Sequence, residues 1–373
     1  MGRTLVLPPE QSIPMLQKRD ENSKNHFSFR DFFHIDSVAL EHTGLEVITM
    51  QEFLETEVLT GNIRHPETGE SLQPPRNRTD WDGIGTFFDD DWKELAIFIR
   101  SLAINPIWNG AECLATFPAR VGPGTAAHLE KMMEEIVNGA DAALRIQGYD
   151  SNPTPVDASA KDRMEESIIF RRELCVYEDE IQKQQVVHFR GTGDGRLLYH
   201  FYSFLYFEDY RQDLWMKRFV RDHLRYVDEI QCAAARIVHT IRQKAIGHGN
   251  PDGEFDAFHI RRGDFHLLYP GAVVDAEEIL ENTYEFLREN STVYIATDET
   301  NMTFFDPLRK HHHVYFLNDF MDEVGNININ FMGMVEQRVC SRGRVFFGTY
   351  YSTFTGYINR MRGAYSWSSV SFR

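Results

Sequence analysis

The stretch "EFDAFHIRRGDFH", residues 254–266, decides the fold, because an apolar run turns abruptly into charge at its end. Residues 255–260 predict a buried β-strand. Arg261, Arg262 and Asp264 follow it at once, with one glycine between them. A strand that ends in this way indicates either a binding site beyond the sheet or an ion pair that caps it. The Arg-Gly-Asp tripeptide also matches an adhesion sequence, but it directly continues a core strand and would be poorly presented to a receptor.

Strand-like and helix-like segments then alternate four times, which is typical of a doubly wound parallel sheet. A long amphipathic helix is expected first, over 227–241. The strands are expected at 255–260, 292–299, 313–319 and 344–349, and the helices at 275–290, around Pro307, at 328–339 and at 351–361. In such sheets ligands bind beyond the carboxyl ends of the strands, so the residues just after each strand are the candidate site.

Three groups at these positions can carry chemistry. Arg261 presents a fixed fork of donors that suits a diphosphate, although a structural ion pair would use the same residue. The helix start at Ser352, Thr353 and Thr355 offers free backbone N–H groups to a phosphate, and ordinary capping by Ser or Thr is the alternative. Asp298 could accept hydrogen bonds from a nucleobase or ribose, but we slightly favour a helix cap.

Other motifs favour structural interpretations. Gly191, Gly193 and Gly195 resemble a nucleotide loop, yet an aromatic strand follows them where a helix is needed, so we expect a hairpin turn. The Asp89-x-Asp91 spacing occurs in metal-dependent sugar-nucleotide enzymes, but an acidic run before a helix is more simply its N-terminus. Adjacent side chains in His311 to His313 cannot share one strand face, which makes metal binding there a weak hypothesis.

Composition excludes several classes of protein. The chain has 373 residues, an apolar fraction of 42% and a formal net charge of -17. A polyanionic partner such as DNA or RNA is therefore not expected, because such binding needs a basic face. No apolar run reaches the length of a membrane span. Four separated cysteines show no metal-ligand spacing and permit two disulfides or none, and three sequons fit a secretory protein but arise easily by chance.

The chain divides by pattern into two α/β domains, residues 1–225 and 226–373. In the first, "RTLVLPP" (3–9) and "LEVITMQEFL" (45–54) predict two strands, the second of which leads into a helix.

Several long motifs resemble the GDP-fucose protein O-fucosyltransferase family, in particular its plant, algal and protist branches. They are "RTLVLPP", "FHIRRGDF" (258–265), "VYIATDE" (293–299) and "VEQRVCSRGRVFFGTYYSTFTGYI" (335–358). The resemblance implies a GT-B-like fold of two Rossmann-like domains that face a cleft, with an acceptor-side N-terminal domain and a C-terminal domain that binds the GDP-sugar. It also implies a secretory-pathway (ER or Golgi) enzyme.

By position, the resemblance implies Arg261 as the catalytic residue, contacting the diphosphate of GDP-fucose as it departs. It implies a GDP-sugar site formed by His259, Arg261, Arg262, Asp264, Asp298, Ser352, Thr353, Phe354 and Thr355. Arginine and helix-terminal donors stabilise the charge that builds on the leaving diphosphate, so no metal or other cofactor is expected.

We therefore expect an inverting, metal-independent glycosyltransferase that moves fucose from GDP-fucose to a protein Ser/Thr or a glycan hydroxyl. The family carries a Gly- and Asn-rich loop and a helix before the "RTLVLPP" strand, where this chain begins. The N-terminal domain is thus expected to lack its first strand and Gly-rich loop, and no general base is identified. The alternative is a non-catalytic relative that binds GDP-sugar or glycan.

Overall fold

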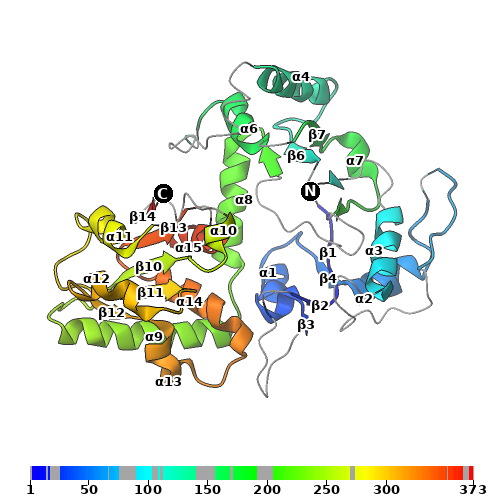
Figure 1. The fold of residues 1–373 in the computed structure, drawn as a ribbon. Coiled ribbons are helices and arrows are strands. Elements are labelled where there is room, and N and C mark those ends of the chain that lie inside the picture. The colour runs from blue at the N-terminus through cyan, green and yellow to red at the C-terminus, as the bar shows by residue number, and fades with distance from the viewer. Residues whose placement is uncertain are drawn as a thin grey trace. The chain divides into compact units, whose positions relative to one another are not determined.

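The chain folds into two compact units, with the break between Leu224 and Arg225 (Figure 1). The computed structural model describes residues 2–13, 16, 26–65, 67–74, 90–102, 108–109, 112–139, 155, 157–168, 171–190, 205–268, 274–350, 352–363 and 369–372. None of the helices in these ranges has the length and apolar character that crossing a membrane requires.

The second unit is built on one five-stranded sheet. Its strands are β10 (Asp256–Ile260), β11 (Thr292–Thr297), β12 (His313–Tyr315), β13 (Phe346–Thr349) and β14 (Ser369–Phe372). They run in the order β12-β11-β10-β13-β14, and every neighbouring pair is parallel. This is the order of a doubly wound sheet, as the alternation predicted, with a fifth strand, β14, that the sequence pattern did not reveal.

Helices pack against both faces of this sheet (Figure 1). They are α9 (Asp228–Gly247), α10 (Phe265–Leu268), α11 (Ala276–Thr283), α12 (Asp306–Arg309), α13 (Met321–Val324), α14 (Met332–Cys340) and α15 (Thr353–Arg362). One face of the sheet carries Phe258, Ile295 and Phe347 on neighbouring strands. These side chains pack in one core with Ile279 of α11 and Leu308 of α12. Helices α9 and α14 pack on each other and on β11.

Two elements of this unit are shorter than the sequence pattern predicts. Helix α11 ends at Thr283, whose hydroxyl donates to the Ile279 carbonyl and competes with the backbone, so the helix does not continue to 290. Strand β12 ends at Tyr315 because a 3-10 turn begins at Leu317. The Asp319 carboxylate accepts from the Phe316 N–H and stabilises that turn.

The first unit consists of several small sheets. The predicted strands are present as β1 (Leu5–Leu7) and β4 (Val47–Thr49), which pair in parallel, and β4 leads into α2 (Met50–Phe53) and a π-helical turn (Leu54–Val58). A three-stranded parallel sheet has the order β7 (Glu173–Val176), β6 (Cys113–Phe117), β9 (Leu205–Phe207). The other pairs are β2 (Gln11–Ser12) with β3 (His26–Phe27), and β5 (Trp108–Asn109) with β8 (Phe189–Arg190). The helices are α1 (Ile35–Glu41), α3 (Asp90–Leu102), α4 (Thr125–Val137), α6 (Ala160–Ile168), α7 (Asp179–Lys183) and α8 (Tyr210–His223).

The cysteines correct one expectation. Cys113 and Cys175 form a disulfide between neighbouring strands β6 and β7, whereas Cys232 and Cys340 are free thiols. The chain therefore has one disulfide, where the sequence permitted two or none, because the two free thiols lie in the other unit, one exposed and the other buried.

Two motifs of the first unit lie largely outside the described residues. Gly191, Gly193 and Gly195 do so, but β8 before them pairs with β5 and β9 after them pairs with β6. Among the described residues these two strands belong to different sheets, and the expected hairpin turn at residues 191–195 lies outside the described residues. Asp89 and the Asp91 side chain also fall outside, while α3 begins at Asp90, as the helix-terminus interpretation expects.

Candidate functional site

The segment after β10 places Arg261 at the carboxyl edge of the sheet. Its Nε lies 3.2 Å from Asp298 Oδ2, and its Nη2 donates to Asp264 Oδ1 at 2.7 Å. These two carboxylates fix the plane of the guanidinium. The Nη1 group makes no hydrogen bond to the described residues, and the side chain remains 31% exposed. Arg261 is therefore held in place while its remaining donors stay accessible to an anion.

Arg262 has a different environment, although it is the next residue. Its Nε donates to Glu299 Oε2 at 2.8 Å, its Nη1 donates to the Val274 carbonyl, and its guanidinium lies 3.8 Å from the centre of the Phe304 ring. The Asn301 N–H and, to a smaller extent, Arg262 hold the pKa of Glu299 below its usual value. Arg262 thus fastens the loop after β10 to the loop after β11.

Asp298 joins the two arginine positions. One carboxylate oxygen accepts from the Arg262 N–H at 2.7 Å, and the other lies against the Arg261 guanidinium. The backbone of Gly263 passes so close that a Cβ there would lie 2.5 Å from Asp298 Oδ2. Glycine at this position therefore allows the loop to close over the carboxylate. In this conformation Asp298 orients the arginines, and its role toward a nucleotide remains a prediction.

The segment between β13 and α15 forms the other side of the candidate site. Thr349 is buried, and its hydroxyl accepts from the Arg261 N–H at 2.9 Å and donates to the His259 carbonyl at 3.2 Å. Ser352 is the N-cap of α15, but its side chain caps no N–H group of the helix. The N–H groups of the first helical turn have no partner within the helix, so this start can accept an anion. The structure therefore brings Arg261 and the α15 N-terminus to neighbouring strand ends.

His259 connects strand β10 to the start of helix α15. Its Nδ1 lies 2.8 Å from the Thr355 hydroxyl, and its ring stacks on Phe354 with the centroids 4.4 Å apart. Burial, with a smaller contribution from Arg261, lowers the pKa of His259 from 6.5 to about 3, so the imidazole is neutral at physiological pH. Being 4% exposed, it is a packing partner of the helix start.

The structure collects most of the predicted residues at one edge of one sheet. His259, Arg261, Arg262, Asp264 and Asp298 lie on or after β10 and β11, and Ser352, Thr353, Phe354 and Thr355 begin α15. His311 to His313 do not belong to this group. His313 begins β12, at the opposite end of the sheet, and its ring stacks on that of His248.

Sequence reasoning missed two residues that shape the site. Gly348 lies in β13 directly under Thr355, where a Cβ would approach Thr355 Oγ1 to 2.7 Å. Phe304 stacks on Arg262 from a 3-10 turn, Met302–Phe305. The glycine in the apolar run "RVFFGT" was a visible signal of close approach, since glycine within a strand often marks such a contact. The spacing between residues 262 and 304 gave no comparable signal.

Comparison with known proteins assigns the chain to a protein family. The model of the family described as GDP-fucose protein O-fucosyltransferase matches residues 1–365. None of the curated proteins matches the chain in sequence. Among solved structures, the apo form of POFUT1 is similar at 13% identity over 99% of this chain and 89% of that one, with a TM-score of 0.38. POFUT1 in complex with GDP-fucose is 14% identical over 99% and 89%, with a TM-score of 0.37. These TM-scores are too low to support an argument about this chain.

Proposed function

The chain belongs to the GDP-fucose protein O-fucosyltransferase family, which matches nearly its whole length, and from this premise we propose that it transfers fucose from GDP-fucose to a hydroxyl acceptor. The observation that carries the proposal is the pairing of Arg261 with the start of α15 at adjacent strand ends. A positively charged fork beside a helix N-terminus suits a diphosphate.

In the proposed reaction the acceptor oxygen forms a bond to the anomeric carbon of fucose as the bond from that carbon to the GDP oxygen breaks. The bonding electrons leave with GDP, so negative charge grows on the diphosphate. The accessible Nη1 of Arg261 and the N–H groups of α15 would stabilise this charge more in the transition state than in the ground state. The acceptor proton passes to a base, and attack from the face opposite GDP inverts the sugar carbon.

The surrounding residues would keep Arg261 in position. Asp264 and Asp298 orient its guanidinium, and Arg262 holds the loop through Glu299. His259 would set the distance between β10 and α15 through Thr355. In this proposal the protein itself supplies the positive charge at the diphosphate, and no metal is needed for that role.

A secretory-pathway location is part of the same proposal. Disulfides persist in oxidising compartments and are rare in the cytosol. The Cys113–Cys175 disulfide in the first unit therefore supports an ER or Golgi protein.

Turnover of GDP-fucose in EDTA tests the proposal. We expect the unmodified chain to release GDP from GDP-fucose. The release should be slow when water is the acceptor and faster when a suitable protein or glycan hydroxyl is present. Arg261→Ala should slow the release by about 10²- to 10³-fold, the usual cost of losing one transition-state donor. Arg288→Ala is the matched control, since that arginine forms an exposed ion pair with Glu254, with side chains 57% and 36% exposed.

Two other outcomes would change the assignment. GDP-fucose binding without any turnover, with or without acceptors, would indicate a non-catalytic relative that binds the sugar nucleotide. Equal turnover by the Arg261 and Arg288 variants would show that the reacting diphosphate lies elsewhere.

A further inference from the structure

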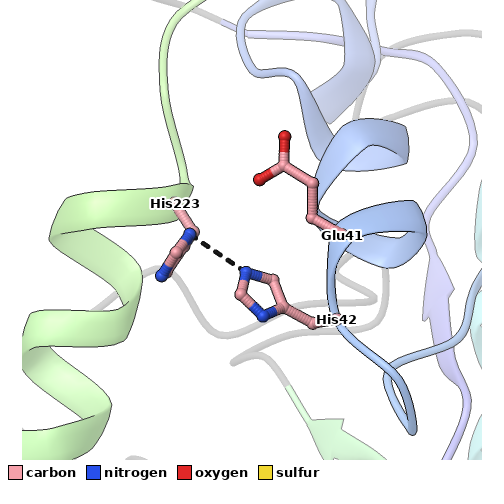
Figure 2. A group of neighbouring side chains, drawn as sticks. All are labelled: Glu41, His42 and His223. Carbon is pink, nitrogen blue, oxygen red and sulfur yellow. Dashed lines mark hydrogen bonds between the residues drawn. The ribbon is translucent and has the colours of Figure 1, made fainter.

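Three side chains that commonly bind metals gather where two helices of the first unit end. Glu41 is the last residue of α1, His42 is its C-cap, and His223 is the last residue of α8. Figure 2 shows the two imidazole rings and the carboxylate grouped between the two helix ends. Within the part of the chain that the structure describes, this is the one group of three or more His, Cys, Asp or Glu side chains arranged to hold a metal ion.

The distances suit a small coordination site. His42 Nε2 and His223 Nδ1 are 3.0 Å apart, and the three ligand atoms all lie within 4.8 Å of one another. Zinc binds imidazole nitrogen at 2.0–2.1 Å in tetrahedral geometry, which places two nitrogens about 3.3 Å apart. A shift of a few tenths of an ångström would therefore turn the present contact into a pair of metal ligands. Two histidines and one glutamate are an established zinc ligand set.

A hydrogen bond between the two imidazoles is the simpler interpretation of the 3.0 Å contact. It requires one ring to donate and the other to accept. A divalent cation would replace the shared proton and could take the Glu41 carboxylate as a third ligand, since the three ligand atoms lie within 4.8 Å of one another. Both helices also direct their C-terminal ends toward the cluster, and the negative end of a helix dipole favours a cation.

Aromatic packing holds the two imidazoles in place. The Phe219 ring lies with its centroid 4.8 Å from those of both His42 and His223, and Trp215 stacks on Phe219 at 5.3 Å. Such packing limits ring rotation, so less conformational freedom is lost when a metal binds. Arg221 pairs with Asp222 directly before His223, with Nε 2.6 Å from Oδ1, so these two opposite charges offset each other beside the cluster.

We propose that Glu41, His42 and His223 form a binding site for a divalent transition metal, with Zn²⁺ as the best match. The ion would connect two segments 181 residues apart in sequence, next to Leu224, the last residue of the first unit. Bound metal would stabilise the first unit, since a ligand that binds only the folded state stabilises that state. The proposal is independent of the fucosyltransferase assignment.

Calorimetric titration of ZnCl₂ into the full chain, stripped beforehand with a chelator, tests the site. We expect saturable binding of a single ion per chain. His42→Ala or His223→Ala should weaken binding by more than about 100-fold, because loss of a ligand costs more than loss of an outer-shell partner, which costs about 10- to 100-fold. Glu41→Gln should weaken it less, by about tenfold. Co²⁺ should give the visible absorption of a four-coordinate site in the unmodified chain alone.

His239→Ala is the control, since His239 is exposed on α9 in the second unit. It should bind Zn²⁺ as the unmodified chain does. Circular dichroism of the metal-free variants shows whether each still folds. Absence of saturable Zn²⁺ binding by the unmodified, folded chain would overturn the proposal whatever the variants do. Unchanged binding by the folded His42→Ala/His223→Ala double variant would overturn it as well.

Discussion

The two units, of which the first is the longer, are stabilised in different ways. The second unit has one five-stranded parallel sheet with helices on both faces, and its candidate site follows from where the strands end. The first unit divides its strands among sheets of two or three and joins β6 to β7 by a disulfide. A continuous sheet positions functional groups through its own geometry, whereas short sheets depend on additional cross-links.

Removing the disulfide should have the largest effect on stability, and it should act on the first unit. Cys113→Ser/Cys175→Ser opens a link between residues 62 apart in sequence, which we expect to cost about 2–4 kcal/mol in the free energy of unfolding. Urea unfolding of the variant measures the loss. Cys232→Ser is the matched control, because Cys232 is an exposed free thiol.

The GDP affinity of the disulfide variant tests whether the candidate site depends on the first unit. If the second unit positions the site by itself, the folded disulfide variant should bind GDP as the unmodified chain does. A parallel loss of GDP affinity would show that the contrast between the units is wrong.

Gly348→Ala should have the next largest effect, in the second unit. The new Cβ would lie against the side chain of Thr355, 2.7 Å from its hydroxyl, and overpacking of this kind costs about 1–3 kcal/mol. It should also weaken GDP binding, since the helix start must move away from β13. Gly356→Ala in the same helix is the control. None of the described residues lies within 4 Å of its Cβ position, so thermal melting should show an unchanged or higher Tm.

The pH dependence of stability tests the buried histidine. His259 has its pKa lowered from 6.5 to about 3, so below pH 6.5 the unfolded chain binds a proton that the folded chain excludes. This contribution is complete above pH 6.5 and is lost as the pH falls toward 3; the loss at pH 5.5 is on the order of 1 kcal/mol. His312, with its pKa lowered to about 4, adds to the same slope.

The contribution of His259 can be isolated by comparing how the free energy of unfolding changes with pH in two variants. His259→Gln should reduce the difference between unfolding free energies at pH 7.5 and 5.5, whereas His239→Gln, at an exposed position, should leave it unchanged. Equal slopes in the His259 variant and the unmodified chain would mean that this imidazole is not neutral and buried.

The sequence predicted the second unit well because its signals are local. The apolar runs that became β10, β11 and β13 are long, and the charges after them marked the site. Strand β14, "SVSF", alternates serine with Val370 and Phe372, but four residues are too few for this alternation to identify a strand that pairs with β13. The different environments of Arg261 and Arg262 also could not be predicted, because Glu299 and Phe304 reach Arg262 through tertiary contacts.

In the first unit the pattern identified β1 and β4, but most of the other strands are too short for periodicity to identify them. Strands β5 and β8 have two residues each, and they pair across 81 positions. The disulfide likewise depends on β6 and β7 becoming neighbours, which nothing in the cysteine spacing indicates. When two strands are far apart in the sequence, tertiary packing decides whether they pair.

The central claim is that Arg261 binds a diphosphate while its neighbour Arg262 fastens the loop. Calorimetric titration of GDP in EDTA into the unmodified chain, Arg261→Ala and Arg262→Ala tests it most directly. We predict that Arg261→Ala weakens GDP binding by about 10- to 100-fold, the value of a charge-assisted hydrogen bond, and that Arg262→Ala weakens it much less while lowering stability. Unchanged affinity in Arg261→Ala, or an equal loss in both variants, would contradict the account.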